Sequence, residues 1–394
     1  MKLKNFEETK RLQKAGIGRN ETARRLSIQA KTISYWRSIE TYTDGRGWKK
    51  GGYRTHTEKE TQRIVVLKKA RIEKKKFFLG SPHIRMDYGK TFPEDTLPSL
   101  WFFDKVVRDA GLQTHEPKKR TRGQDRVQRL RFPIHSIVGL GRIQQASDFI
   151  GKKFISGRTE PISIFSTSYY QWFQLYEIWR TEAESAVCAI EKLTRLWHTT
   201  PIPNVMRMDN GMTFRGTGAG VARVGTFLKF LLNLGVTPLF SSPYQSYTNP
   251  HIEGHNRTFT EKLWGQHTFT KLDDIDGACE RFNAESREYY EYAFKERLTH
   301  RGLRFVVPEK LIVTDRLQST RGKKVCFIRF VEKWLERGRE SGIVLLNKFV
   351  SLPEAYLNQY VFVTINLETS TLIITSEHDG IVDEILRQPF PYTL

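Results

Sequence analysis

The stretch VMRMDNGMTF, residues 205–214, places an acidic residue directly after a short apolar run. Such a run is typical of a buried strand, and Asp209-Asn210-Gly211 is a common turn sequence. Around it, from about 140 to 295, strand-like runs such as ISIFSTSYYQWFQLYEIW (two strands or a hairpin) alternate with helix-like runs such as TEAESAVCAIEKLTRLW. This alternation predicts an α/β fold for the middle of the chain.

The two ends of the chain have other patterns. Residues 1–40 have helical spacing, and 41–56 form a Gly-rich linker. Residues 57–127 form a second helical region, expected to bind DNA as well, that ends in a basic linker. Residues 325–394 contain short alternating strand-like runs with turn residues between them, which predict a small β-barrel. The chain is therefore expected to be multidomain, with an all-α part, an α/β core and a β-barrel.

Residues 20–37, NETARRLSIQAKTISYWR, have the spacing of a helix-turn-helix. Asn20 is expected to cap the first helix, and Ser27 stands where a small turn residue is needed. The second helix is expected to expose side chains that reach DNA phosphates or base edges, although an ordinary helical hairpin has the same spacing. The candidate DNA-binding residues are Arg24, Arg25, Gln29, Lys31, Thr32, Tyr35 and Arg37.

The charge of the chain is concentrated in its first third. The net charge is +21, and residues 1–130 hold 32 Lys and Arg against 15 Asp and Glu. Such a basic region favours a polyanion, above all nucleic acid, through counterion release, although a merely soluble basic surface is the alternative.

Cysteines and apolar runs are sparse. The three cysteines are far apart, which argues against a disulfide framework or a cysteine zinc site. No signal-peptide core or membrane-length apolar run is found, so a cytoplasmic protein is expected.

Three carboxylates stand out, although each has an ordinary structural explanation. Asp148 lies in QASDFIG at the edge of a strand-like segment, Asp209 ends the strand quoted above, and Glu253 lies in SYTNPHIEGHNRTF. Asn249 suits a helix cap and Pro250 a first helical position, so Glu253 is expected one turn into a helix. Three carboxylates brought together would repel one another unless a divalent cation such as Mg²⁺ or Mn²⁺ neutralised them.

These segments resemble a known family in their order and context. QASDFIG, RMDNGMTF and SSPYQSYTNPHIEGHNRTF are similar to motifs of the retroviral-integrase-like transposases of bacterial insertion sequences. The resemblance is clearest over about 140–310 and implies an RNase H-like core. It also implies that Asp148, Asp209 and Glu253 form an Asp-Asp-Glu metal triad, supported by Asn210, Asn256 and Arg257.

The resemblance also implies an activity. It is the metal-dependent hydrolysis of phosphodiester bonds at element ends, followed by strand transfer to target DNA, with two Mg²⁺ or Mn²⁺ ions per active site. The expected partners are double-stranded DNA and further copies of the chain in a synaptic complex, in a bacterial cytoplasm at the nucleoid. A catalytically inactive or domesticated DNA-binding regulator with the same fold, and an RNase H-like nuclease without strand transfer, remain alternatives.

The two histidines beside Glu253 raise the question of a zinc site. His251 and His255 have a zinc-compatible spacing, but Glu253 lies between them. Position i+2 of a helix points about 200° away from position i, so the glutamate would face away from both rings. The histidines are therefore expected to be bystanders near DNA.

Overall fold

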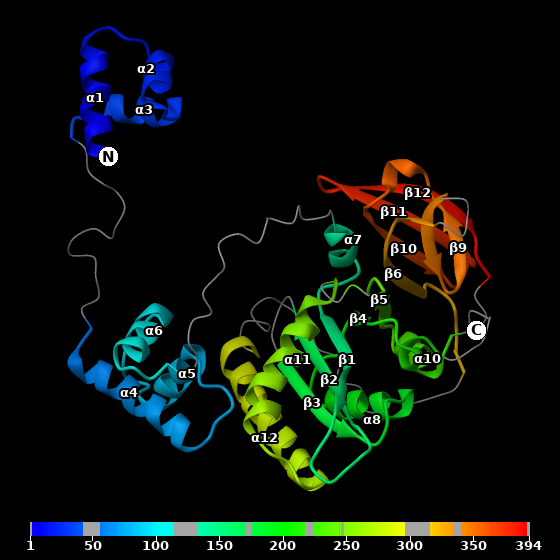
Figure 1. Cartoon of the computed structure of the whole chain (residues 1–394). Coiled ribbons are helices and arrows are strands. Elements are labelled where there is room, and N and C mark those ends of the chain that lie inside the picture. The colour runs from blue at the N-terminus through cyan, green and yellow to red at the C-terminus, as the bar shows by residue number, and fades with distance from the viewer. Residues whose placement is uncertain are drawn as a thin grey trace. The chain divides into compact units, whose positions relative to one another are not determined.

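The chain forms two compact units, Met1–Thr61 and Gln62–Leu394. The computed structural model in Figure 1 describes residues 2–41, 56–113, 132–170, 175–216, 224–243, 245, 248–295, 316–334 and 340–391. The Gly-rich linker over 41–56 lies mostly outside these residues, and the basic linker at the end of 57–127 lies outside them, as does much of the Gly-rich stretch 215–226. Within the described part, no helix has the length and apolarity that crossing a membrane requires.

The first unit contains the helices α1 (Lys2–Lys14), α2 (Arg19–Leu26) and α3 (Ala30–Ser38). Phe6 and Trp36 meet edge to face with their ring centroids 6.3 Å apart, and Ala23 and Ile33 complete a small core. Ser27 adopts the left-handed conformation that turns α2 into α3, with φ of 53°. The predicted helix-turn-helix is therefore formed, but α2 begins after Gly18 rather than Asn20 because the Thr22 amide already donates to the Gly18 carbonyl.

A second group of helices follows, comprising α4 (Glu58–Glu73), α5 (Ser81–Thr91) and α6 (Leu100–Asp109). Thr57 and Glu60 form a reciprocal capping box at the start of α4, in which each backbone amide bonds the other side chain. Gly111 follows the end of α6 with a φ of +65°, a conformation that favours glycine. The core between these helices includes Ile64, Tyr88 and Phe103.

The middle of the chain forms five strands, β1 (Gln144–Lys153), β2 (Ile162–Tyr170), β3 (Leu175–Thr181), β4 (Val205–Met208) and β5 (Thr237–Phe240). Their order in the sheet is β3-β2-β1-β4-β5. The pairs β1–β2 and β2–β3 are antiparallel, and the pairs β1–β4 and β4–β5 are parallel. The short helix α7 (Ile134–Val138) precedes β1, and α9 (Met212–Arg215) follows β4. The expected RNase H-like core is confirmed by this mixed sheet.

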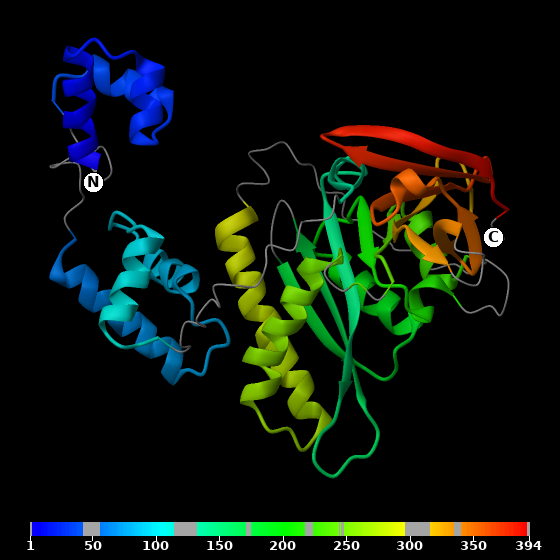
Figure 2. The same cartoon turned by 45° about the horizontal axis from the view of Figure 1, so that its top comes forward.

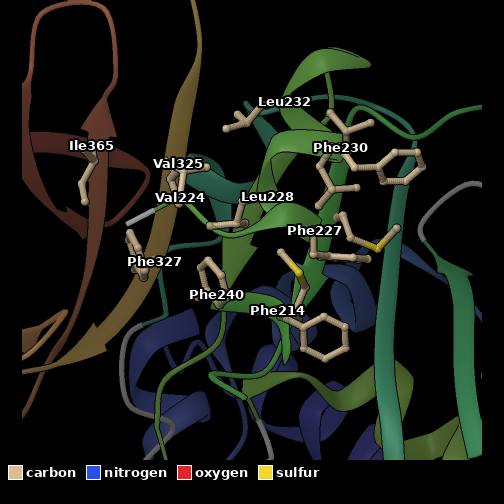
Figure 3. Packing of buried hydrophobic residues seen from close by; sticks show 14 of the residues in the cluster. Phe214, Val224, Phe227, Leu228, Phe230, Leu232, Phe240, Val325, Phe327 and Ile365 are labelled. Carbon is tan, nitrogen blue, oxygen red and sulfur yellow. The ribbon is translucent and has the colours of Figure 1, made fainter. Parts of the chain in front are cut away.

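Helices cover both faces of this sheet (Figure 2). Helices α8 (Ala186–Trp197) and α10 (Thr226–Asn233) pack on one face, where Phe214, Phe227 and Phe240 belong to the main hydrophobic core shown in Figure 3. Helices α11 (Pro250–Lys262) and α12 (Leu272–Tyr290) pack on the other face against isoleucines of β1 to β3. The helix α11 is the next helix after β5, and it packs against β2 and β1.

The C-terminal part, where a small β-barrel is expected, contains antiparallel strands that continue the core sheet. β6 (Lys324–Phe330) pairs in parallel with β5, and β10 (Tyr360–Asn366), β11 (Thr371–His378) and β12 (Ile381–Pro389) extend the sheet to nine strands. β7 (Glu332–Trp334), β8 (Glu340–Leu345) and β9 (Lys348–Ser351) form a second sheet. The sequence pattern predicts a region of its own over 325–394, but Phe327 stacks on Phe240 at 5.1 Å, so apolar packing joins this region to the core.

Candidate active site

The strand register brings Asp148 and Asp209 together. Ala146 of β1 is paired with Arg207 of the parallel strand β4. Because side chains two residues further along a strand lie on the same face, Asp148 and Asp209 become neighbours across the two strands. Asp209 is close enough to raise the pKa of the Asp148 carboxyl. Asp148 lies within β1 rather than at its edge as predicted, but it lies beyond the last residue of β1 that β4 pairs with.

The surroundings of Asp148 disfavour its negative charge. Burial and the neighbouring Asp209 together raise the pKa of the Asp148 carboxyl to about 7. A side-chain amide opposes this, since Nδ2 of Asn256 donates to Oδ2 of Asp148 at 3.0 Å. Asn256 is itself held by the Ser166 hydroxyl, which donates to Oδ1 of Asn256 at 2.7 Å. The helix α11 and the strand β2 thus jointly orient this carboxylate.

Asp209 is held by the turn that follows it. The Gly211 amide donates to Oδ1 of Asp209 at 2.9 Å, which is an Asx-turn. Desolvation by the surrounding protein raises the pKa of the Asp209 carboxyl, against the opposing effects of this amide and of Arg215. The Asp-Asn-Gly sequence therefore forms a turn and also holds the Asp209 carboxylate in place.

Glu253 lies in the first turn of α11, as predicted, and its amide contacts the Asn249 carbonyl at 3.3 Å. Ile252, Phe259 and Leu263 form its buried side. Asn249 precedes the helix, but its side chain makes no capping hydrogen bond. Within the described ranges, no group of three or more acidic, histidine or cysteine side chains is arranged to hold a metal ion. Glu253 as the third ligand therefore stays a prediction.

The two histidines of α11 lie in aromatic surroundings. His255 is fully buried and stacks on Tyr176 with ring centroids 4.4 Å apart, and burial lowers its pKa to about 3. His251 stacks on Tyr170 at 4.5 Å. The expectation that both rings lie near DNA is wrong for His255, because the ring fills the core between α11 and β3. This arrangement gives no support to a zinc site.

The supporting residues have different surroundings. Asn210 donates through Nδ2 to the Ser241 carbonyl at 2.5 Å and accepts at Oδ1 from Nη2 of Arg329 at 2.9 Å. Asn256 bonds Asp148, as described above, whereas Arg257 is exposed on α11. Sequence reasoning missed Arg329 and Ser166. The only signal for Arg329 is a cation in the otherwise apolar middle of KVCFIRF.

The candidate DNA-binding residues of the first unit are mostly accessible. Gln29, Lys31 and Tyr35 are exposed, whereas Thr32 is half-buried. Arg24 and Arg25 are also exposed, and both form ion pairs with Glu21.

Arg37 differs from the expectation that it is exposed. It is half-buried, and its Nη2 donates to the Ile17 carbonyl at 2.6 Å and to the Thr22 hydroxyl at 3.0 Å. These bonds give Arg37 a role in holding α3 against α2.

A basic cleft lies between the segment after α4 and the helix α12. Its volume is about 660 Å³, and cationic side chains line much of it. Its acidic residues are already engaged, since Glu285 accepts from the Phe77 and Phe78 amides and Glu288 pairs with Lys90. The lining side chains are Lys74, Lys75, Lys76, Phe77, His267, Arg281, Ala284, Glu285 and Glu288.

Comparison with known proteins gives structural similarities only. No protein-family model matches the chain, and no curated protein matches it either. The catalytic core domain of BIV integrase is similar over 41% of this chain and 99% of its own, with 14% identity and a TM-score of 0.30. A chain of the simian T-cell lymphotropic virus intasome, in complex with PP2A regulatory subunit B56 gamma, is similar over 75% of this chain and 92% of its own. Its identity is 11% and its TM-score 0.30. At these values the similarity carries no functional assignment, which depends instead on the residues of the site.

Proposed function

We propose that the chain is a metal-dependent DNA transposase or integrase whose site contains Asp148, Asp209 and Glu253. The observation that carries this proposal is the register of β1 and β4, which makes Asp148 and Asp209 neighbours on the sheet face that α11 covers. Asn256 of α11 bonds Asp148 on this same face. Two partly desolvated carboxylates in one place are unfavourable for stability alone and are typical of a cation site.

The donor set fits Mg²⁺ or Mn²⁺, which prefer carboxylate oxygens. Asp148 and Asp209 would hold the metal, and Glu253 would complete the site for the second ion. When bound, such ions activate a hydroxyl nucleophile and stabilise the leaving oxygen of an in-line phosphoryl displacement. The chain's own contribution is orientation, since Asn256 fixes the Asp148 carboxylate and the Gly211 amide fixes that of Asp209.

The reaction has two balanced steps. Water attacks a phosphodiester phosphorus at the element end, one P–O bond forms, and the P–O3′ bond breaks to leave a free 3′-hydroxyl. That hydroxyl oxygen then bonds a phosphorus of target DNA, and a 3′-hydroxyl of the target strand departs. Because each step replaces one phosphodiester P–O bond, no oxidant or nucleotide cofactor is needed.

The first third of the chain would bind the DNA. The helix-turn-helix exposes Gln29, Lys31 and Tyr35, and the charge excess of residues 1–130 favours a polyanion. Recognition of element ends by this unit would bring the core to the cleavage site. Strand transfer at two ends requires more than one copy of the chain, so a homo-oligomeric synaptic complex is part of the proposal.

A non-catalytic DNA-binding regulator is the second candidate. The observation in its favour is that no group of three or more metal-ligating side chains is found among the described residues. A regulator would keep the fold and the DNA contacts but would perform no chemistry.

One assay separates the candidates. Labelled element-end DNA is incubated with target DNA and Mg²⁺ or Mn²⁺, and the wild type is compared with Asp209→Asn, which keeps the shape of the side chain. We expect cutting and joining by the wild type and a drop in rate of roughly two orders of magnitude or more in the variant, as for other groups that act in the transition state. Cutting without joining would indicate a nuclease. Binding without chemistry in the wild type would indicate a regulator, and equal activity of both proteins would refute the role of Asp209.

A further inference from the structure

A buried arginine from the C-terminal part reaches the candidate active site. Arg329, the sixth residue of β6, is 3% exposed. Its guanidinium makes three hydrogen bonds, of which Nη2 donates to Oδ1 of Asn210 at 2.9 Å. Nη1 donates to the Ser241 carbonyl at 3.0 Å and to the Ile328 carbonyl at 2.8 Å. Arg329 therefore connects three adjacent strand ends, those of β4, β5 and β6.

These bonds follow from the sheet topology. β4, β5 and β6 are parallel neighbours, so their carboxyl ends meet at one edge. Asn210 follows β4, Ser241 follows β5, and the two are already joined by the 2.5 Å bond from Nδ2 of Asn210 to the Ser241 carbonyl. Arg329 adds a second connection to each of them. The planar guanidinium presents donors from two different nitrogens in a fixed fork, whereas a lysine ammonium presents its donors from a single nitrogen and without that fixed geometry.

Stability alone does not account for a cation at this place. All three acceptors are uncharged, and no ion pair of Arg329 with a carboxylate is found among the described residues. A buried charge without an opposite charge is costly, and an apolar side chain of similar volume often stabilises a core as well or better. The arginine is explained if the geometry of the Asn210 turn has to be fixed.

We propose that Arg329 is a positioning residue for the candidate active site and that it fixes the turn carrying Asp209. The path is short, because Asn210 is bonded by Arg329 on one side and is covalently next to Asp209 on the other. The C-terminal strand β6 is then a structural part of the metal site rather than only a flanking element. This inference rests on the proposed function, since it assumes that Asp209 binds a metal.

The test compares Arg329→Lys and Arg329→Met with the wild type in the full-length chain. Mn²⁺ binding is measured by the electron paramagnetic resonance signal of free Mn²⁺, and strand transfer is measured across a Mn²⁺ titration. Removal of outer-shell support typically weakens metal binding about 10- to 100-fold. We therefore expect the half-saturating Mn²⁺ concentration to rise by about that factor in Arg329→Lys, while excess Mn²⁺ restores part of the rate. Affinity for element-end DNA should stay within about twofold.

Two further measurements separate positioning from a merely structural role. Hydrogen exchange in the metal-free protein should become faster in the peptide covering residues 205–215 of Arg329→Lys. A structural role alone would lower the thermal midpoint and the active fraction but leave the half-saturating Mn²⁺ concentration of that fraction unchanged. Arg387→Met, an exposed arginine of β12, is the matched control and should behave as wild type.

The outcomes are distinct. Wild-type Mn²⁺ affinity and exchange in Arg329→Lys would overturn the role of Arg329 while leaving the proposed function intact. If Arg329→Met does not fold, the Mn²⁺ affinity and hydrogen exchange of Arg329→Lys alone decide whether Arg329 positions the site. A wild type that neither binds Mn²⁺ nor transfers strands would overturn the proposed function, and the inference about Arg329 with it.

Discussion

Asn256 is the residue that connects α11 to the pair of aspartates. It accepts from the Ser166 hydroxyl and donates to Asp148, so the three side chains form a line from β2 to the carboxylate. Removing the amide leaves the buried carboxylate of Asp148 without this donor. The same change frees the carboxylate to rotate away from Asp209.

We therefore expect Asn256→Ala to lower the strand-transfer rate about 10- to 100-fold, which is the usual effect of removing a partner that orients a metal ligand. Single-turnover kinetics with saturating DNA measure this rate. Thr258→Ala is the control on the same helix, because the Thr258 hydroxyl bonds only the Gly254 carbonyl of its own helix. Equal rates for both variants would show that Asn256 does not orient the site.

The burial of His83 should make the stability of the fold depend on pH. Its ring is stacked between Phe78 at 4.9 Å and Tyr289 at 4.3 Å. Burial, with the positive charges of Arg71 and Lys262 nearby, lowers its pKa to about 3. Asp87 on the same helix faces Arg71 at 3.3 Å. The ordinary pKa of histidine is about 6.5, so the unfolded chain binds more protons than the folded one between these values.

The contribution of His83 to stability is consequently full above about pH 6.5 and falls as the pH decreases through that value toward 3. The slope from one histidine is at most about 1.4 kcal/mol per pH unit. Urea unfolding at pH values of about 7.5 and about 5, on either side of the ordinary histidine pKa, should show a larger decrease for the wild type than for His83→Phe, which keeps a stacking ring. A pH slope that is identical in both proteins would contradict the buried, neutral state of His83.

Single residues also mark the limit of prediction from sequence. Asp148 and Asp209 can be identified because their motifs are local, and their proximity then follows from the parallel register of β1 and β4. Arg37 and His255 cannot be assigned from sequence, because their burial depends on elements that are far apart in the chain. Arg329 is missed for the same reason, since its partners Ser241 and Asn210 lie 88 and 119 residues upstream.

At the scale of elements, the segment after α4 predicts a DNA contact. Lys74 and Lys75 are exposed beside the basic cleft, and Arg281 of α12 lines the same cleft. Replacing all three by glutamine should weaken DNA binding without altering its sequence preference, because phosphate contacts carry no base information. The slope of log affinity against log salt should fall by about 0.9 for each DNA phosphate that the variant no longer neutralises.

Fluorescence anisotropy at several salt concentrations measures this slope for specific and scrambled duplexes. The matched control replaces Lys152, Lys153 and Arg158, in and after β1, by glutamine and removes the same charge. If the affinity falls equally in both triple variants, the cleft has no special part in DNA binding and only net charge matters.

Most helices and strands can be predicted from the spacing of apolar residues, whereas the elements that they pair or pack with cannot. The runs that form α8 and β4 are predicted correctly because each is a short, regular apolar pattern. GIVLLNKFV has the pattern of one strand but forms the hairpin of β8 and β9, since Leu346 and Asn347 have positive φ values of 49° and 64°. Leucine rarely adopts a positive φ, whereas two-residue hairpin turns usually contain Asn-Gly, Asp-Gly or Gly-Gly. The Leu-Asn pair therefore gives no sign in the sequence that the chain turns here.

At the scale of the whole molecule, the C-terminal strands and the α/β core share one sheet and one hydrophobic core. Val325 and Phe327 of β6 belong to the same cluster as Phe227 and Leu228 of α10 (Figure 3). A region that folded by itself would leave the core intact when removed. A shared sheet predicts that the core does not stay intact. Removing the C-terminal strands would expose Phe227 and Leu228 of α10 to solvent and would leave the edge of β5 without a paired strand.

We expect a chain ending at residue 316 to be unfolded or aggregated, although it keeps all three candidate metal ligands. Removing residues 1–56 is the matched control, because the first compact unit ends at Thr61, in the first turn of α4. This shorter chain should unfold cooperatively. Circular dichroism, thermal unfolding and limited proteolysis of both chains test this difference. A cooperative transition in the chain ending at 316 would show that β6 is an addition to the core, and it would also remove the structural basis for a role of Arg329 at the Asp209 turn.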